Sequence, residues 1–221
     1  MRELENWVNN PIDRYGCLNL YASIILAAGL SRRFPGNKLL YEWWDKPIIY
    51  HTVKNVIDSG VDIIVVVTGY MSREISNVLR PLNDRVVIVY NERYVEGMSS
   101  SVKTGVEKLL EEGLKIKALF ITPGDCAWIP SIVYDLMMMY FNEYNPLILI
   151  ASHHGRAGHP ILFHSVLIDE LLQVSEETMG LKSIVSKYKH YVRYYEVFHP
   201  GVILDLDDYS DLNRVKYTVM K

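Results

Sequence analysis

Short apolar runs rich in β-branched residues alternate along this chain with segments of helical periodicity. The apolar runs are residues 22–26, 61–68, 86–90, 118–122 and 146–151. The helical segments between them are residues 47–59, 72–79, 99–112 and 131–143. Apolar runs without strict alternation are typical of strands that are covered on both faces in a parallel sheet. The pattern therefore predicts an α/β fold, with a three-layer, doubly wound and mostly parallel sheet of the Rossmann-like type.

The pattern is less regular after residue 151. A loop rich in glycine and histidine is predicted at 155–160, followed by a short strand at 161–163. Further helices are predicted at 169–174 and 181–188, and closing strands at 191–197 and 202–204. A terminal helix is predicted at 209–221, with Asp207 or Asp208 as its N-cap. Residues 1–20 lack clear periodicity and are expected to form an N-terminal extension without an assigned role, and residues 21–221 a single domain.

Composition limits the classes of protein and partner. The 221 residues are 49% hydrophobic and 22% charged, which is ordinary for a domain that buries a real core. The formal net charge of −3 argues against a nucleic-acid partner. Two cysteines make no disulfide framework. We find neither a signal peptide nor an apolar run that spans a bilayer, so we expect a soluble, cytoplasmic protein without a membrane partner.

The first apolar run breaks at once into small residues, a glycine and cations. Small side chains let backbone N–H groups approach an anion, and a strand-end loop of this type is suited to a triphosphate. The alternative is an ordinary turn with solvated cations. The loop matches neither the Walker motif nor the dinucleotide fingerprint. Its candidate nucleotide contacts are Leu26, Ala27, Ala28, Gly29 and Ser31, and its candidate catalytic cations are Arg33 and Lys38.

Other polar residues follow later strands of the predicted sheet. The carboxyl ends of parallel strands meet at one rim, where open α/β sheets bind ligands. The further candidate nucleotide contacts are Thr68, Gly69, Asn91, Gly97, Ser99 and Ser100. Ser99 or Ser100 is also expected to cap the helix that begins there.

Three carboxylates are candidates for a magnesium site. Asp125 directly follows a predicted strand, and Mg²⁺ is bound in proteins through one or two carboxylates plus substrate phosphates. Strand alternation puts Asp205 and Asp207 on one face, and we expect Asp207 as the second ligand, ahead of Asp205. An ordinary turn aspartate is the alternative interpretation of Asp125.

The histidine-rich segment near residue 155 is expected to face a substrate. The spacing of His153, His154 and His159 is not that of a zinc site. Arg156 and His159 are the candidate anion contacts. Cys126 has no identifiable partner base, so nucleophilic catalysis by this cysteine finds no support.

With these residues in view, the chain resembles the molybdenum cofactor cytidylyltransferases, within the molybdopterin nucleotidyltransferases and sugar-nucleotide pyrophosphorylases. The resemblance covers residues 23–214. It is carried by Leu-Ala-Ala-Gly-Leu-Ser at 26–31, Glu-Gly-Met-Ser-Ser-Ser at 96–101, Gly-Asp at 124–125, Gly-His-Pro-Ile-Leu-Phe at 158–163 and Leu-Asp-Leu-Asp at 204–207. Three departures are Cys126-Ala127 in place of Met-Pro, Asp-Tyr-Ser-Asp at 208–211 in place of Thr-Pro-Glu-Asp, and Lys182 where relatives commonly have arginine.

The resemblance implies an Mg²⁺-dependent nucleotidyltransferase that moves CMP from CTP to the phosphate of molybdenum-loaded molybdopterin. Ala28 implies CTP, because the GTP-using branch typically has glycine there. Arg156, His159 and Lys182 are the implied acceptor contacts, and a recipient molybdoenzyme is an implied partner. The alternatives are a guanylyltransferase of the same pathway, a sugar-1-phosphate nucleotidyltransferase, or a nucleotide-binding cofactor chaperone without turnover.

Overall fold

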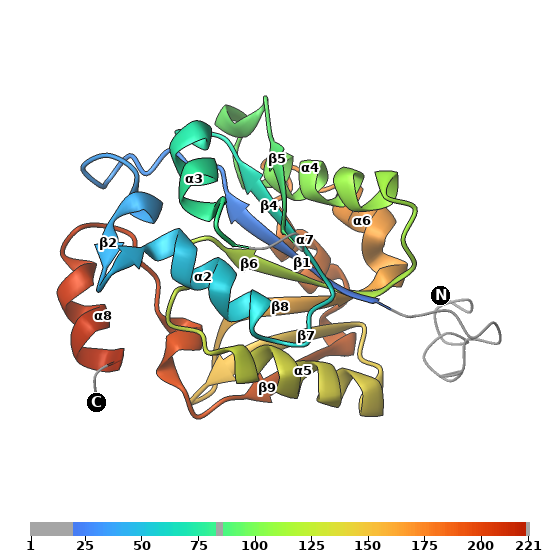
Figure 1. Cartoon of the computed structure of the whole chain (residues 1–221). Helices are drawn as coiled ribbons and strands as arrows, with labels where there is room; N and C mark the ends of the chain where they lie inside the picture. Colours follow the sequence, from blue (N-terminus) through green and yellow to red (C-terminus); the bar gives the residue numbers. More distant parts are fainter. Residues whose placement is uncertain (1–19, 83–85, 220–221) are drawn as a thin grey trace.

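A seven-stranded sheet runs through the centre of the protein (Figure 1). The computed structural model describes residues 20–82 and 86–219. In spatial order the strands are β5 (Val86–Tyr90), β4 (Ile63–Thr68), β1 (Leu20–Ala27), β6 (Ile116–Pro123), β8 (Arg156–His164), β7 (Ile148–His153) and β9 (Val192–Glu196). A small second sheet pairs β2 (Glu42–Trp43) with β3 (Lys46–Pro47).

The sheet is mostly parallel, as predicted. The pairs β1–β4, β1–β6, β4–β5 and β7–β9 are parallel, and only β8 runs against its two neighbours. The strand β1 lies in the middle of the parallel part, and its residues from Tyr21 to Ile25 are all buried. This burial from both faces explains why its sequence is apolar without alternation.

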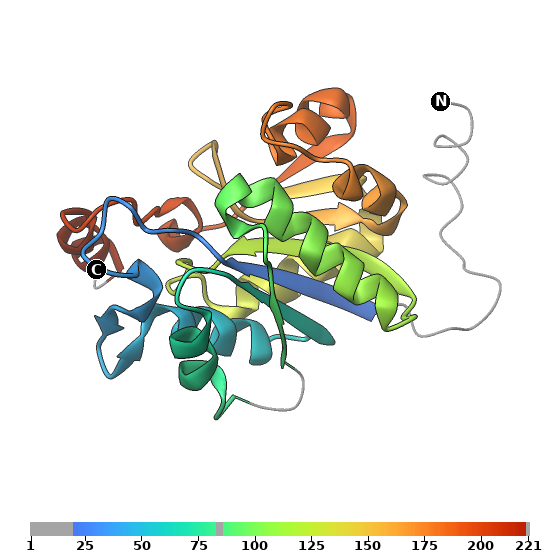
Figure 2. The same cartoon turned by 90° about the horizontal axis from the view of Figure 1, so that it is seen from above.

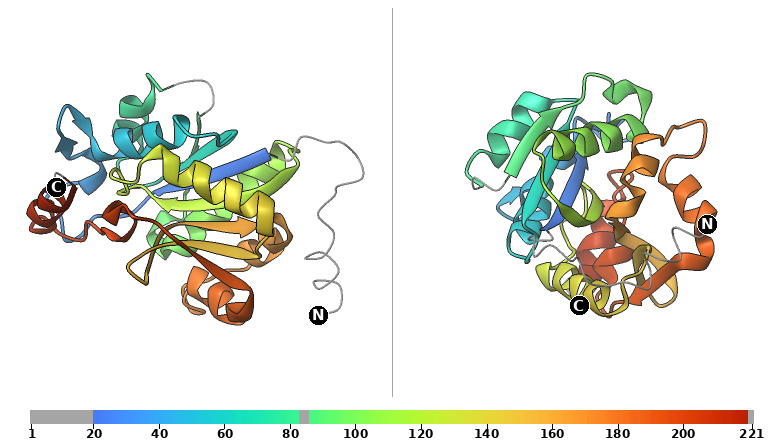
Figure 3. Two further views of the ribbon diagram at one scale, coloured as in Figure 1. Left: turned by 90° about the horizontal axis from the view of Figure 1, so that it is seen from below. Right: turned by 90° about the vertical axis from the view of Figure 1, so that its right-hand side faces the viewer.

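Helices cover both faces of the sheet, which gives the three layers. On one face α2 (Ile48–Ile57), α3 (Ser72–Leu79) and α5 (Ser131–Tyr144) form one apolar cluster with the strands. On the other face α4 (Met98–Glu111), α6 (Ile168–Leu172) and α7 (Leu181–Lys187) form a second cluster. Figure 2 shows α4 in green beside the orange helices, and Figure 3 shows α5 in yellow on the opposite side.

A third apolar cluster joins the end of the chain to the segment after β1. Leu212 and Val215 of α8 (Asp211–Val219) pack with Phe34, Trp43 and Trp128. Figure 1 shows the red helix α8 beside the small sheet formed by β2 and β3. This packing brings the acidic residues before α8 next to the cations that follow β1.

Two predictions for the C-terminal third are wrong. Of the segment predicted as a loop at 155–160, only Gly155 lies in a turn, and residues 156–160 belong to β8, a nine-residue strand that pairs with β6 and β7. The predicted strand at 202–204 lies in a 3-10 helix, Pro200–Ile203, and its continuation. The proline and glycine at the start of this helix suit a tight turn better than a strand. The prediction instead followed the apolar residues at 202–204.

The remaining predicted elements match the structure within a few residues at their ends. The terminal helix begins at Asp211, and the carboxylate of Asp208 accepts a hydrogen bond from the backbone N–H of Ser210 just before it. The predicted extension at 1–20 lies, except for its last residue, outside the described residues. No helix within residues 20–82 and 86–219 is both long and apolar enough to cross a membrane.

Candidate active site

The polar segments that follow the parallel strands lie side by side at one rim of the sheet. Backbone hydrogen bonds connect them: Tyr70 N–H to Ala28 O at 3.4 Å, Asn91 N–H to Thr68 O at 2.9 Å, and Gly124 N–H to Leu26 O at 2.9 Å. The ends of β1, β4, β5 and β6 therefore meet, as the parallel pairing requires. Gly29 lies in the loop at this rim, and a side chain added there would meet no atom within 4 Å.

The loop after β1 is held by its own polar side chains. The Ser31 hydroxyl accepts the backbone N–H of Lys38 at 3.2 Å. Asn37, which is buried, accepts the N–H of Leu39 and donates to the carbonyl of Tyr70 at 3.2 Å. These contacts fix the backbone from which the Lys38 side chain extends, and Ser31 has a structural role whether or not it also contacts a ligand.

The ammonium of Lys38 connects three segments of the rim. Its Nζ donates to a carboxylate oxygen of Asp125 at 2.5 Å and to the carbonyl of Leu206 at 2.7 Å. The two charged side chains are largely buried, with exposed fractions of 24% and 13%. Coulombic attraction is stronger in such a site than in water. The structure thus brings together two of the residues predicted as catalytic, one from the segment that follows β1 and one from the turn that follows β6.

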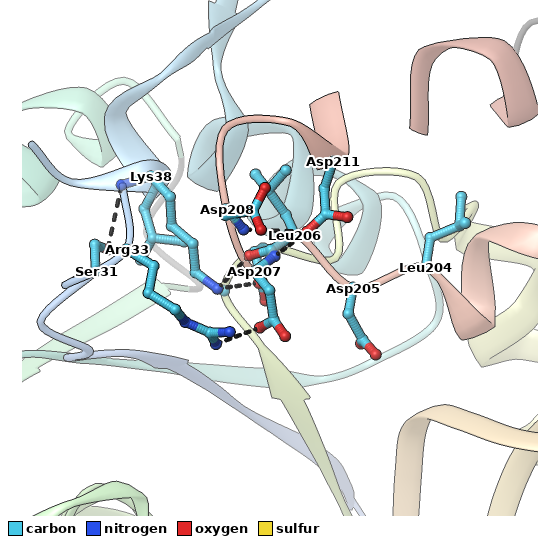
Figure 4. A network of polar contacts seen from close by, with 12 residues as sticks. Ser31, Arg33, Lys38, Leu204, Asp205, Leu206, Asp207, Asp208 and Asp211 are labelled. Carbon is cyan, nitrogen blue, oxygen red and sulfur yellow. Dashed lines mark hydrogen bonds and ion pairs between the residues drawn. The ribbon is translucent and has the colours of Figure 1, made fainter. Parts of the chain in front are cut away.

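The acidic segment from Asp205 to Asp211 faces these cations (Figure 4). Arg33 pairs with Asp207 at 3.0 Å, and both side chains of this pair are more than half exposed. The carboxylate of Asp211 accepts the backbone N–H groups of Asp207 and Asp208, which holds the turn before α8. In Figure 4 the side chains of Asp205 and Asp207 point to the same side of the segment, as alternation predicted.

Two of the three candidate magnesium ligands act on the same neighbours. The negative charges of Asp125 and Asp205 add to burial in holding the pKa of the Cys126 thiol well above its usual range. Burial lowers the pKa of His159, and the same two carboxylates partly oppose this shift. Asp125 and Asp205 therefore act on the same two side chains, Cys126 and His159, whereas Asp207 is paired with Arg33.

This donor set fits magnesium. All three candidates offer carboxylate oxygens, and Mg²⁺ takes one or two of them together with phosphate oxygens and water. Within residues 20–82 and 86–219, no three His, Cys, Asp or Glu side chains form a group that could hold a metal ion, so phosphate oxygens and water would have to complete the coordination. A protonated, buried Cys126 is also unsuited to act as a nucleophile, in agreement with the sequence analysis.

The side chains that follow β4 and β5 are mostly engaged within the protein. Thr68 is buried and bonds to the Ser72 hydroxyl and the carbonyl of Val89. Asn91 donates to the hydroxyls of Ser100 and Ser101 at 2.8 and 3.1 Å. These residues shape the rim, and any contact with a nucleotide would involve mainly their backbone groups. Gly69 packs so closely on Tyr94 and Ala28 that an added Cβ would lie 2.5 and 2.9 Å from their Cβ atoms.

The expected serine cap of α4 is not formed. Gly97 occupies the N-cap position, and the single proton of the Ser100 hydroxyl is within reach of two carbonyls, those of Arg93 and Gly97. The backbone N–H of Ser99 donates instead to the carboxylate of Glu176 at 2.7 Å. The buried Ser99 hydroxyl has no hydrogen-bond partner among the described residues. No sequence signal indicated Glu176, because it lies 77 residues away along the chain.

A pocket of about 390 Å³ lies between β8 and α7, next to the acidic segment. All three residues predicted to bind the acceptor, Arg156, His159 and Lys182, line it together with Asp205. Sequence reasoning missed a third cation at its wall, Lys189, because only the fold brings the end of α7 to β8. The apolar part of the wall consists of Ile150, Ile161, Leu181, Val185 and Ile203.

The pocket and the Lys38–Asp125 pair both contact the segment 203–206, because Ile203 and Asp205 line the pocket and the Leu206 carbonyl accepts the Lys38 ammonium. Gly158 of β8 lies against this segment, and a Cβ at this position would come within 1.9 Å of the Val202 carbonyl oxygen. His159 follows directly, and its ring Nδ1 is buried without a partner among the described residues. The absence of a side chain at Gly158 therefore lets β8 approach the segment that leads to Asp205, which lines the same pocket as His159.

Comparison with known proteins now identifies the family. The model of the MobA-like NTP transferase domain matches residues 23–192. The chain belongs to this family. The match includes the loop after β1, the rim residues and the strand β8, but not the acidic segment before α8.

Two curated relatives are named as nucleotidyltransferases of the molybdenum cofactor. The molybdenum cofactor cytidylyltransferase of Escherichia coli is 29% identical over 87% of this chain and 94% of its own length. A probable molybdenum cofactor guanylyltransferase of Thermococcus sibiricus is 30% identical over 68% of this chain and 70% of its own.

The fold is also that of solved structures. The crystal structure of Rv0371c from Mycobacterium tuberculosis superimposes with a TM-score of 0.76 at 21% identity, covering 89% of this chain and 97% of that one. A complex of the same protein with manganese gives a TM-score of 0.69 at 18% identity, with 89% and 98% coverage. The predicted Rossmann-like nucleotidyltransferase fold is thereby confirmed.

Proposed function

We propose that this protein transfers CMP from CTP to the terminal phosphate of molybdenum-loaded molybdopterin and releases pyrophosphate. The observation that carries the proposal is a shared segment: Ile203 and Asp205 line a cationic pocket with an apolar wall, and the next carbonyl, that of Leu206, accepts the ammonium of Lys38, which is paired with Asp125. The cytidylyltransferase of Escherichia coli, which resembles this chain over nearly its whole length, supports the choice of reaction. Ala28 supports the choice of CTP.

The pocket suits an acceptor with an anionic end and a flat ring system. Arg156, Lys182 and Lys189 offer donors and positive charge for a phosphate, while isoleucine, leucine and valine side chains provide an apolar wall. The side chains of these three cations make no ion pair among the described residues, so an anionic ligand would supply the missing counter-charge.

The loop after β1 suits the triphosphate. The ammonium of Lys38 and the guanidinium of Arg33 would bind its β- and γ-phosphates, exchanging the carboxylates of Asp125 and Asp207 for phosphate oxygens. The open space beside Gly29 leaves room for a phosphate to approach the backbone N–H groups of the loop, which would add further donors. Positive charge held there stabilises the pyrophosphate as it leaves.

The acceptor phosphate carries its own negative charge and needs no strong base. The chain's task is to bring two polyanions together in line and to compensate their charge. A magnesium ion held by Asp125 with Asp205 or Asp207 would add positive charge at the α-phosphate. His159, neutral because burial lowers its pKa, would face the acceptor without adding a further charge.

Pyrophosphate release tests the proposal directly. The protein is incubated with molybdopterin and, in turn, CTP, GTP, ATP and UTP, with and without Mg²⁺. We expect release with CTP and Mg²⁺ only. The variant D125N serves as the inactive control, and it should lose turnover while keeping its fold by circular dichroism. No release with any nucleotide would contradict the proposal, and release with CTP and a sugar phosphate would redirect it to that acceptor.

A guanylyltransferase is the second candidate, supported by the relative from Thermococcus sibiricus at a similar level of identity. The same assay separates the two, since release with GTP in place of CTP would assign this function. The variant A28G is then informative, because a glycine at this position is typical of the GTP-using branch.

A further inference from the structure

A carboxylate from a distant segment occupies the N-terminus of α4. Glu176 accepts the backbone N–H of Ser99 at 2.7 Å, although the two residues are 77 positions apart. The first N–H groups of a helix lack partners within the helix and carry partial positive charge. A carboxylate therefore makes a charge-assisted hydrogen bond there, which is stronger than a neutral one.

The backbone at Gly97 is adapted to this contact. Gly97 has φ of +110°, which side chains rarely tolerate, and a Cβ there would lie 2.6 Å from the Cγ and Cδ atoms of Glu176. Any larger residue at this position would push the Glu176 side chain away. The glycine thus leaves the space that the carboxylate fills.

The turn that carries Glu176 is bonded without interruption to α7. The carbonyl of Glu176 accepts the N–H of Met179 at 3.0 Å, and the carbonyl of Met179 accepts the N–H of Lys182 at 3.2 Å. The Gly180 N–H bonds to the carbonyl of Ser175 at 2.8 Å. A fixed position of Glu176 therefore fixes the first turn of α7.

Two functional parts of the rim are connected in this way. Lys182 stands on the first turn of α7 and lines the cationic pocket. Gly97 and Ser99 stand at the N-terminus of α4, among the predicted nucleotide contacts. In Figure 2, α4 in green and the orange helices lie on the same face of the sheet.

We propose that Glu176 is a positioning residue, which holds Lys182 in the acceptor pocket by anchoring the turn before α7 to the N-terminus of α4. Glu176 acts through Lys182 and touches no reacting atom. The anchoring itself follows from the contacts of the chain, whereas its effect on the acceptor rests on the proposed function.

Hydrogen exchange of the full chain tests the anchoring without any assay of activity. In E176A we expect the amides of Ser99 and of α7 to exchange about tenfold faster, because one charge-assisted hydrogen bond is lost. In E176Q the amide oxygen keeps an acceptor, so most of the protection should return. The control E177A changes the neighbouring exposed glutamate, whose side chain makes no hydrogen bond or ion pair with the described residues. Exchange in E176A equal to that of the unmodified protein would overturn the proposal.

Steady-state kinetics test the consequence for Lys182. We expect E176A to raise the KM for molybdopterin about tenfold while kcat and the KM for CTP stay unchanged, and E176Q to restore most of the effect. A fall in kcat together with a rise in both KM values would show that Glu176 has only a structural role. A lower KM for CTP would instead make Glu176 a competitor of the nucleotide, and either result rejects our assignment. If the unmodified protein releases no pyrophosphate, the proposed function fails while the exchange experiment still decides the anchoring.

Discussion

The two halves of the rim differ in how their cations are balanced. At the loop after β1, Lys38 and Arg33 are paired with Asp125 and Asp207. In the pocket between β8 and α7, Arg156, Lys182 and Lys189 have no carboxylate partner among the described residues. One half holds a balanced set of charges, and the other holds an excess of positive charge.

The difference indicates how each half would respond to an anion. A ligand at the paired half has to replace the carboxylate that is bound to Lys38 or Arg33. Its selectivity therefore depends on its contacts with both the cation and the released carboxylate. A magnesium ion that binds the released carboxylate would favour the exchange. A ligand at the unpaired half gains charge complementarity directly. Four predictions test this contrast, from the largest expected effect to the smallest.

Removing the central cation of the paired half should have the largest effect. We expect K38A to lower kcat on the order of 10²-fold or more, because it removes charge compensation for the leaving pyrophosphate and leaves Asp125 unpaired. The measurement is pyrophosphate release at saturating CTP. The control is K54A, which breaks an exposed pair with Asp58 on α2. A change in K38A no larger than that in K54A would contradict the assignment.

The junction between the two halves should be sensitive to a single methyl group. We expect G158A to lower the free energy of unfolding by about 1–3 kcal/mol, because its Cβ would collide with the Val202 carbonyl, which is backbone and cannot rotate away. Urea denaturation measures this effect. The neighbouring A157S, at an exposed position, is the control and should unfold at nearly the same urea concentration.

Removing one cation from the unpaired half should weaken acceptor binding. We expect K182A to raise the KM for molybdopterin about tenfold with little change in kcat, since binding in the ground state and in the transition state loses the same contact. K187A, on the same helix, removes a lysine that pairs with Glu170 and should leave this KM unchanged. Equal effects of the two variants would show that Lys182 contributes only general positive charge.

The exposed pair of the first half should contribute least to stability. We expect D207N to change the free energy of unfolding by less than about 1 kcal/mol, because both side chains of the Arg33–Asp207 pair are more than half exposed and screened by water. Thermal unfolding of D207N beside D125N measures the contrast with the buried pair. A larger loss in D207N than in D125N would reverse our ranking of the two pairs.

Much of the fold could be predicted from the sequence because its signals are local. Apolar runs such as residues 61–68 are covered on both faces by helices, and the helices between them begin and end close to the predicted limits. The second half of β8 was predicted as a strand at 161–163, but its first residues, which are arginine, alanine, glycine and histidine, were predicted as a loop. They form a strand because β7 provides a partner for backbone hydrogen bonds.

The sequence by itself determined the layers of the sheet, the loop after β1 that is suited to a triphosphate, and the set of carboxylates and cations. Each of these features depends on the types and spacing of residues that are close together in the sequence. Only the tertiary structure decided how these groups are matched: Asp125 with Lys38, Asp207 with Arg33, and Glu176 with the N-terminus of α4. Such contacts join residues separated by tens to more than a hundred positions. They depend on the pairing of β1 with β6, on the packing of α7 in the second apolar cluster and on the packing of α8 in the third. No short stretch of sequence carries that information.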